Sequence, residues 1–166
     1  MTLGMSLSLF TQVHVALSLI GIGTGLLVVF GLISGRLLRF WTGLFLLTTV
    51  LTCVTGFLFP FKGITPGIVV GILSMVLLAL AIAALYLFHL AGGWRTTFAI
   101  TAAISLYLNV FVLIVQLFEK VPALHALAPT QSEPPFKIAQ LLALALFVVL
   151  TVVATRGFRN ALAGRA

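Results

Sequence analysis

The side chains able to do chemistry are few in this sequence, and most of them lie inside long apolar stretches. Among 166 residues there are three histidines, two carboxylic acids and one cysteine. Histidine, asparagine, glutamine and threonine side chains can hold a ligand by hydrogen bonding. Polar groups are costly to bury in lipid, so those within apolar stretches are candidates for a functional site. The candidate pocket residues are His14, Thr52, Thr55, Asn109, Gln116 and Gln140.

Catalysis has little support among these residues. The only carboxylates, Glu119 and Glu133, lie in one segment, and neither pairs clearly with a base. The sequence has no nucleophile elbow and no spacing typical of metal ligands, so we expect no catalytic residue and no metal site. Cys53 is the only cysteine, which excludes an intramolecular disulfide and a redox pair. The sequence therefore favours a protein that is not an enzyme.

The elements that carry these side chains are five long apolar segments. Hydrophobic residues make up 62% of the chain and charged residues 7%, which excludes a water-soluble enzyme. A helix needs about 20 apolar residues to cross the hydrocarbon core of a bilayer. We predict an all-α, polytopic membrane helix bundle, formed by a single domain over residues 1–166. The expected spans are 9–33, 41–59, 67–90, 97–118 and 138–155, and the expected long proline-rich loop is 119–136.

The basic residues predict the orientation of the bundle. If the five spans alternate in direction, all six arginines fall on one side, and both glutamates fall on the other side beside the lysines. The positive-inside rule then places the N-terminus outside and the C-terminus in the cytoplasm. Because the basic residues flank apolar runs, we expect no nucleic-acid partner. The arginines are Arg36, Arg39, Arg95, Arg156, Arg159 and Arg165.

Small residues predict where the helices pack against one another. Lipid tails are as apolar as leucine, so membrane helices associate through close packing and interhelical hydrogen bonds. Gly21 and Gly25 form a GxxxG pair in the first span, and Gly67 and Gly71 form another in the third. We expect these four glycines at helix contacts.

The candidate pocket residues are expected at similar depths below the outer ends of their helices. At about 1.5 Å per residue, His14 lies about 8 Å and Asn109 about 14 Å below the outer ends of their helices. Gln116 and Gln140 are expected at shallower depth, and Thr52 and Thr55 at comparable depth, so four of the five expected helices bring polar groups to one level. Above them we expect a cap formed by residues of the long loop, Glu119, Lys120, His125 and Glu133.

Two interpretations of these polar side chains at similar depth stay open. The side chains could join helices by hydrogen bonds, which contribute about 0.6 kcal/mol each in membranes. They could instead line an outward-facing pocket for a small or lipid-like ligand. In the second case we expect a non-catalytic subunit or partner of a larger membrane assembly, held with other membrane subunits or with a second copy of itself.

Electron transfer is the alternative class of function, with b-type haem or quinone as cofactor. His14 and His89 both lie in expected spans, and histidine is a common axial ligand of haem. They are expected to be about 20 Å or more apart in depth, which excludes a single haem ligated by both. His14 with His125, or His14 alone, stays open. A quinone would need only a hydrogen-bonding side chain beside an apolar slot.

Two stretches carry a resemblance to a known family. They are TGFLFPFKGITP at 55–66 and LAPTQSEPPF at 127–136. The chain resembles a family of small, uncharacterised multi-pass membrane proteins of proteobacteria, and the resemblance covers most of its length, including residues 109–116. It implies a location in the bacterial inner membrane. It implies no activity and no site residue.

Overall fold

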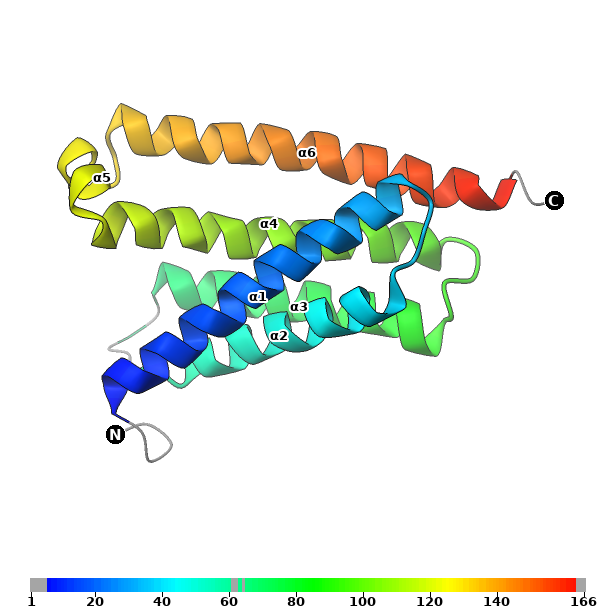
Figure 1. The fold of residues 1–166 in the computed structure, drawn as a ribbon, viewed down its shortest axis with the longest axis horizontal. Helices are drawn as coiled ribbons and strands as arrows, with labels where there is room; N and C mark the ends of the chain where they lie inside the picture. The colour runs from blue at the N-terminus through cyan, green and yellow to red at the C-terminus, as the bar shows by residue number, and fades with distance from the viewer. Residues whose placement is uncertain (1–5, 61–62, 64, 164–166) are drawn as a thin grey trace.

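The computed structural model describes residues 6–60, 63 and 65–163, and in that part of the chain the regular structure is entirely helical. Figure 1 shows long helices packed side by side with one short helix at a turn. The elements are α1 (Leu7–Ile33), α2 (Arg39–Phe57), α3 (Pro66–Ile82), the π-helical turn η1 (Ala83–Leu87), α4 (Trp94–Lys120), α5 (Pro122–Leu127) and α6 (Pro134–Ala163).

Five of these helices are long and apolar enough to cross a membrane, when α3 and η1 are counted as one. Their lengths run from 19 to 28 residues, which matches the thickness of a hydrocarbon core. The predicted all-α bundle with five candidate spans is thereby confirmed.

The segment from 119 to 136 differs from the expected loop. Helix α4 continues to Lys120, α5 occupies Pro122–Leu127, and α6 begins at Pro134. The prolines begin helices here, because the first helical N–H has no intrahelical acceptor and its loss costs little. Helix α6 also continues eight residues past the expected end at residue 155, through a segment that carries arginines.

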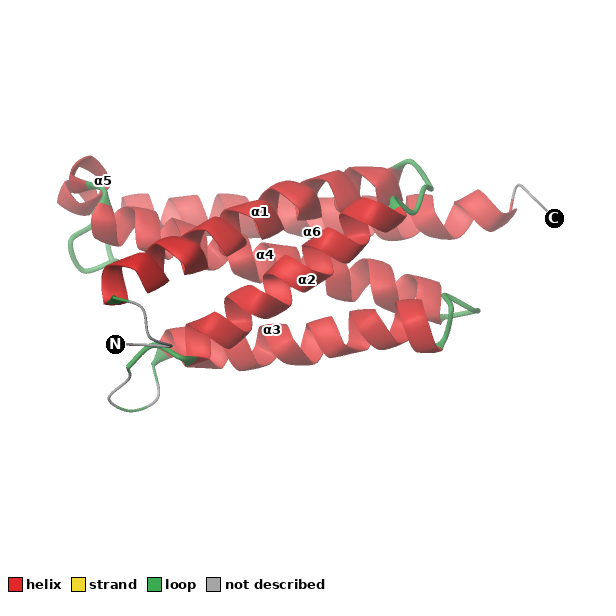
Figure 2. Ribbon diagram, turned by 60° about the horizontal axis from the view of Figure 1, so that its bottom comes forward, coloured by secondary structure: helices red, strands yellow, loops and turns green. Residues whose placement is uncertain are grey.

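Helices α1, α2, α3 and α4 surround one interior, and the fifth long helix, α6, packs against the outside of this group. Helix α1 contacts α2, α4 and α6, while α3 contacts α2 and α4. Helix α6 packs on α4 and α1, so it lies away from α2 and α3 (Figure 2). In Figure 1, α1 crosses α4 obliquely, and the two helices diverge toward the N-terminal end of α1. The largest buried side chains of the core include Phe45, Phe98, Phe158, Leu32 and Leu106.

Two glycines allow α1 to approach its neighbours. A methyl group on Gly25 would lie 2.7 Å from Cδ1 of Leu106 and 2.9 Å from the ring of Phe45. A methyl group on Gly21 would lie 3.1 Å from Oγ1 of Thr49 and 3.2 Å from Nδ2 of Asn109. Both glycines therefore lie where α1 meets α2 and α4.

The two glycines of the second expected pair, Gly67 and Gly71, have different surroundings. A methyl group on Gly71 would lie 2.8 Å from the ring of Phe57, so α3 approaches α2 closely there. A methyl group on Gly67 would have Oγ1 of Thr65, which caps the same helix, as its nearest neighbour at 3.8 Å. Gly67 thus differs from the expectation of a helix contact, because it lies in the first turn of α3, where the wall of a cavity begins.

A third close approach, which the sequence analysis did not identify, joins α6 to α1. A methyl group on Gly157 would overlap the backbone carbonyl of Ile33. Next to this contact, Gly35 has a φ of +69°, which turns the chain out of α1 toward α2. The absence of a side chain at residue 157 therefore sets how closely the end of α6 can pack against the end of α1.

Candidate functional site

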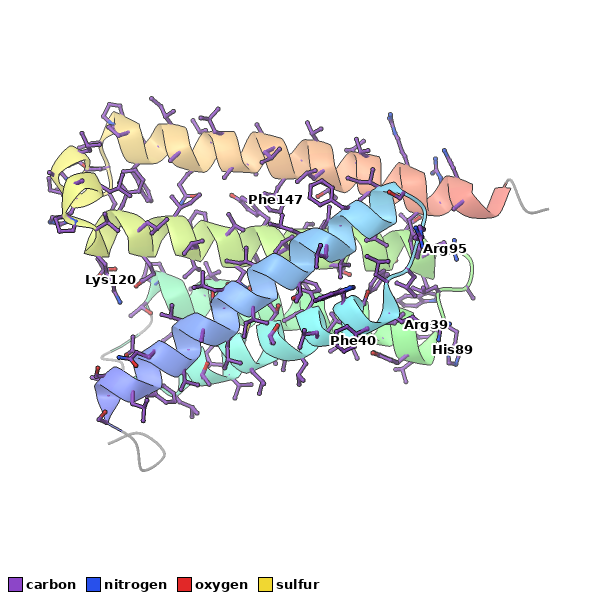
Figure 3. The ribbon with its side chains drawn as sticks, in the orientation of Figure 1. Arg39, Phe40, His89, Arg95, Lys120 and Phe147 are labelled. Atoms are coloured by element: carbon purple, nitrogen blue, oxygen red, sulfur yellow. The ribbon has the colours of Figure 1, made fainter. Side chains whose placement is uncertain are left out.

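A cavity of about 580 Å³ lies between α1, α2, α3 and α4 at one end of the bundle. This is the Lys120 end, where α1 and α3 begin and α2 and α4 end; Arg95 lies at the opposite end (Figure 3). The volume is in the range of small-molecule sites. Most of the wall is apolar, with Phe57, Val112 and Leu113 among its side chains. Such a cavity suits a ligand that is largely hydrophobic and carries a few polar atoms.

Four of the six predicted pocket residues line the cavity, and a fifth supports it from behind. The lining residues are His14, Thr52, Asn109 and Gln116. Thr55 does not line the cavity, but its Oγ1 lies 2.8 Å from Nδ1 of His14. The structure therefore brings together α1, α2 and α4 at the level expected from their polar faces.

His14 is fixed by two contacts. Its Nδ1 shares a hydrogen bond with Thr55, and its ring packs edge to face against Phe59 at a centroid distance of 5.2 Å. The Thr55 hydroxyl also lies 2.7 Å from the carbonyl oxygen of Leu51. Because a hydroxyl has one hydrogen, Thr55 can donate either to Leu51 or to His14, and this choice sets the tautomer of the imidazole.

Asn109 forms the floor of the cavity together with Ser18. The Ser18 hydroxyl donates to Oδ1 of Asn109 at 2.7 Å, and Nδ2 of Asn109 donates to the Ser18 carbonyl at 3.4 Å. This pair fixes the orientation of the amide, because the flipped amide would place two acceptor oxygens against each other. It also joins α4 to α1, so Asn109 holds the helices together as well as lining the cavity.

The threonines of α2 fall into two kinds. Thr48, Thr52 and Thr55 each donate a hydrogen bond to the carbonyl four residues earlier in their own helix. Thr49 does not: its hydroxyl has no partner among the described residues, although the side chain is only 2% exposed. Thr49 lines the cavity. Helical periodicity does not single out this residue, because it lies one position away from the face shared by the other threonines.

The mouth of the cavity carries charge. Glu119 and Lys120, at the end of α4, both line it. Nε2 of Gln116 lies 3.4 Å from Oε2 of Glu119, a long hydrogen bond within the last turns of the helix. Two of the four expected cap residues are therefore at the cavity, where they present one negative and one positive group to an incoming ligand.

Gln140 is not part of the cavity. It lies on α6, and its Nε2 donates to the carbonyl of Phe111 on α4 at 3.2 Å. The expected place in the pocket required α6 to face the same interior as α1 and α2. Because α6 packs on the other side of α4, Gln140 contributes to the contact between those two helices instead.

The other two expected cap residues also lie apart from the cavity. His125 is exposed on α5. Glu133 precedes α6, and its carboxylate accepts hydrogen bonds from the Thr130 hydroxyl at 2.8 Å and from the Ser132 amide at 3.0 Å. Loss of water contacts raises the pKa of Glu133, but these hydrogen bonds outweigh that effect and hold the pKa below its usual value. Glu133 therefore organises the turn that leads into α6.

No group of three metal-ligating side chains occurs in the described part of the chain. His89 follows η1 at the Arg95 end (Figure 3), whereas His14 lies near the start of α1 at the Lys120 end. A haem ligated by both is therefore excluded by the fold. His125 does not line the cavity that contains His14.

Comparison with known proteins identifies no relative, since no family model, no curated protein and no solved structure matches the chain. Besides Thr49, the cavity includes polar residues outside the six expected ones: Thr11 and Ser18 on α1 and Ser74 on α3. Thr11 and Ser18 share the helical face of His14, so that face identified them indirectly. Ser74 is an isolated hydroxyl in an apolar run, and no sequence signal distinguished it.

Proposed function

We propose that this protein binds a small or lipid-like ligand in the cavity at the Lys120 end, as a non-catalytic part of a larger membrane assembly. The observation that carries the proposal is the combination of apolar walls with polar side chains from four different helices in one cavity. Packing alone would join such groups in pairs and fill the space between them. Here His14, Asn109 and Gln116 border an open volume.

The location and orientation are part of the same proposal. We place the chain in a bacterial inner membrane, in keeping with the resemblance to small inner-membrane proteins. The described arginines belong to the opposite end from the cavity, with Arg39 and Arg95 visible there (Figure 3). The positive-inside rule makes that end cytoplasmic, so the cavity opens near the outer surface.

The partner in the assembly is proposed from α6. Its most apolar window is the least buried of the five candidate spans, at 11% against 22–50% for the others. Large apolar side chains cover this surface, among them Leu141, Leu142, Val148 and Val149. Lipid, another membrane subunit or a second copy of the chain would pack there, and chemical cross-linking in native membranes distinguishes them.

The test of ligand binding compares cavity variants with a variant elsewhere. We expect Asn109→Leu and Gln116→Leu to lose a co-purifying small molecule, measured by mass spectrometry after gentle solubilisation. A ligand group left unpaired in a buried site costs about 1 to 3 kcal/mol of binding. Thr151→Val is the control, because the Thr151 hydroxyl bonds to the carbonyl of Phe147 within α6, outside the cavity. If all three variants retain the same molecules, the polar groups only join helices.

Electron transfer is retained as the second candidate because His14 lines the cavity. A single histidine could ligate a b-type haem there, and a quinone would need only its hydrogen bond. A bound haem gives a Soret band, and we expect His14→Ala to abolish it. A folded sample with no visible absorption before or after addition of haemin removes haem as the cofactor. Quinone is then tested by extraction and chromatography.

A further inference from the structure

A second cavity, of about 440 Å³, lies at the Arg95 end of the protein, where α2 begins and η1 ends. Three polar side chains line it: Arg39 from the first turn of α2, Tyr86 from η1, and His89 from the turn that follows η1. Arg39 and His89 are visible at this end in Figure 3. All three side chains are exposed, and none of them has a hydrogen-bond partner among the described residues. Their N–H and O–H groups can therefore be reached from outside the chain.

Arg39 and Tyr86 meet on one face of α2. The Tyr86 hydroxyl lies 3.9 Å from the position that a methyl group on Gly43 would occupy, and the absence of a side chain at residue 43 leaves room for it. Arg39 is one helical turn before Gly43 on the same face, which corresponds to about 6 Å of rise. Both side chains line the same cavity. A guanidinium and a phenolic hydroxyl in this arrangement can donate hydrogen bonds to one oxyanion.

An unusual turn places His89 at the cavity. In η1 the hydrogen bonds span five residues, and the N–H of Phe88 donates to the carbonyl of Ala83 at 3.0 Å. Such π-helical turns are rare and frequently occur at functional sites. His89 and Leu90 then have φ values of +47° and +57°, a conformation that is unfavourable for residues with side chains. A glycine would adopt it more easily, so the turn retains strain while it holds an imidazole at the cavity.

The cavity has no acidic side chain to balance its charge. The chain contains only two carboxylic acids, Glu119 and Glu133, and both lie at the opposite end. The neighbouring Arg95 is held by α6, because its guanidinium donates to the carbonyl of Phe158 at 3.1 Å and lies 4.5 Å from the centre of that ring. Arg39 has no such contact among the described residues. Its counter-ion therefore has to come from outside the chain.

Apolar side chains adjoin the polar groups on both elements. Phe40 follows Arg39, and Leu87 follows Tyr86. At 72% and 70%, Phe40 and Leu87 are the most exposed large hydrophobic side chains in the described part of the chain. A small soluble anion would leave them in water, whereas the acyl chains of a lipid would cover them. The surroundings therefore favour an anion that is part of a lipid.

We propose that this cavity binds the phosphate group of an anionic phospholipid in the leaflet at the Arg95 end. Arg39 donates to the phosphate through its guanidinium, which can form two parallel hydrogen bonds with such a group. The Tyr86 hydroxyl and a ring N–H of His89 donate to the remaining oxygens. A zwitterionic headgroup would bring its own cation to an end rich in arginine, so a net negative headgroup is preferred. The proposal rests on the proposed location in a membrane and not on the ligand of the cavity at the Lys120 end.

The test measures binding to the full-length protein in a non-ionic detergent by native mass spectrometry. The probes are dioleoylphosphatidylglycerol, dioleoylphosphatidylcholine, and glycerol 3-phosphate as a phosphate ester without acyl chains. In ammonium acetate at about 0.2 M, attraction between exposed charges is largely screened beyond about 7 Å. We expect phosphatidylglycerol to bind about fivefold more tightly than phosphatidylcholine, and glycerol 3-phosphate at equal concentration not to displace it.

Two matched pairs of variants locate the site. Arg39→Gln should lower the affinity for phosphatidylglycerol about fivefold, whereas Arg36→Gln removes the same charge from the preceding linker, outside the cavity, and should leave the affinity nearly unchanged. Tyr86→Phe removes one hydroxyl and no charge, and should lower the affinity about threefold. Tyr107→Phe is its control, because Tyr107 packs against Phe147 between α4 and α6. Arg39 and Tyr86 are exposed, so their variants should fold, and circular dichroism checks this.

Three outcomes would overturn the proposal. The first is equal binding of the two phospholipids to the unmodified protein. The second is an equal loss in Arg39→Gln and Arg36→Gln with no loss in Tyr86→Phe, since the attraction would then belong to the basic surface in general. The third is displacement of phosphatidylglycerol by glycerol 3-phosphate, which would identify a site for soluble phosphate esters. The function proposed for the other cavity is tested separately, by Asn109→Leu and Gln116→Leu.

Discussion

Two glycines on α1 give a matched test of how the bundle packs. Gly25 faces α2 and α4, where an added methyl group would lie 2.7 Å from Leu106 and 2.9 Å from Phe45. Gly23 is two residues away, and a methyl group there would meet nothing within 4 Å. The substitutions Gly25→Ala and Gly23→Ala therefore add the same atom to the same helix in opposite surroundings.

The expected magnitudes follow from this difference. Carbon atoms prefer separations of about 3.5 to 4.0 Å, so the neighbours of residue 25 must retreat by about 1 Å. Leu106 and Phe45 are 0% and 1% exposed, so neither can move into free space. Overpacking of this kind costs about 1 to 3 kcal/mol. In Gly23→Ala only the helix propensity changes, which favours alanine by up to about 1 kcal/mol.

The assay is unfolding of the two variants and the unmodified protein in one mixed micelle, followed by circular dichroism during titration with dodecyl sulfate. We expect Gly25→Ala to unfold at lower denaturant and Gly23→Ala at equal or higher denaturant. The gap between the variants should be about 1 to 4 kcal/mol. If Gly25→Ala were as stable as Gly23→Ala, α1 could not lie against α2 and α4 as described.

Three further predictions concern other parts of the fold. Gly157→Ala should lose more stability in the same assay than either variant of α1, because its methyl group would meet the backbone of Ile33, which cannot rotate away; an unchanged midpoint would contradict this contact. In intact spheroplasts an impermeant thiol reagent should label Ser132→Cys and not Ser34→Cys, and the opposite pattern would reverse the proposed orientation. Because the pKa of Glu133 is lowered by folding, its ionised form stabilises the protein above the ordinary pKa of 4.5, and this contribution disappears as the pH falls through the lower pKa of the folded state. The thermal midpoint of the unmodified protein should therefore exceed that of Glu133→Gln at pH 7 by more than at pH 3, and an equal gap at both pH values would refute the role of this carboxylate.

The five candidate spans could be predicted because a lipid bilayer would impose a simple requirement. Every backbone polar group must be satisfied inside the segment, so a long apolar run has to be a helix. The ends of the helices were less predictable than their existence, as α6 shows. The mean hydropathy of the sequence falls where Arg156 and Arg159 begin, so the apolar run stops there. A helix can nevertheless continue through these residues, since long basic side chains keep their charges at the membrane surface or in water. The helix continues past residue 155 to Ala163.

The site could be predicted only as far as helical periodicity carries the argument. The period of 3.6 residues placed His14, Thr52, Asn109 and Gln116 on inward faces, and the structure places all four at one cavity. Periodicity does not say which helices are neighbours. Gln140 lies on an inward face of α6, but that face meets α4 at Phe111 rather than the cavity. Its displacement follows from the packing order, which the sequence of a single chain does not encode in any local pattern.

The polar side chains of the candidate spans differ in whether they keep a hydrogen bond available for a ligand. A threonine hydroxyl normally satisfies itself on the carbonyl four residues earlier, as Thr48, Thr52 and Thr55 do. Such residues are polar in the sequence but have no hydrogen left for a ligand. Asn109, which lines the cavity, keeps one N–H besides the one that it donates to Ser18, whereas the unpaired hydroxyl oxygen of Thr49 is itself buried and cannot be reached from the cavity. Leaving a buried donor unpaired costs about 1 to 3 kcal/mol, so a molecule in the cavity that accepts a hydrogen bond from Asn109 is stabilised there. The availability of hydrogen bonds, rather than the number of polar residues, therefore argues for a ligand at this end of the bundle.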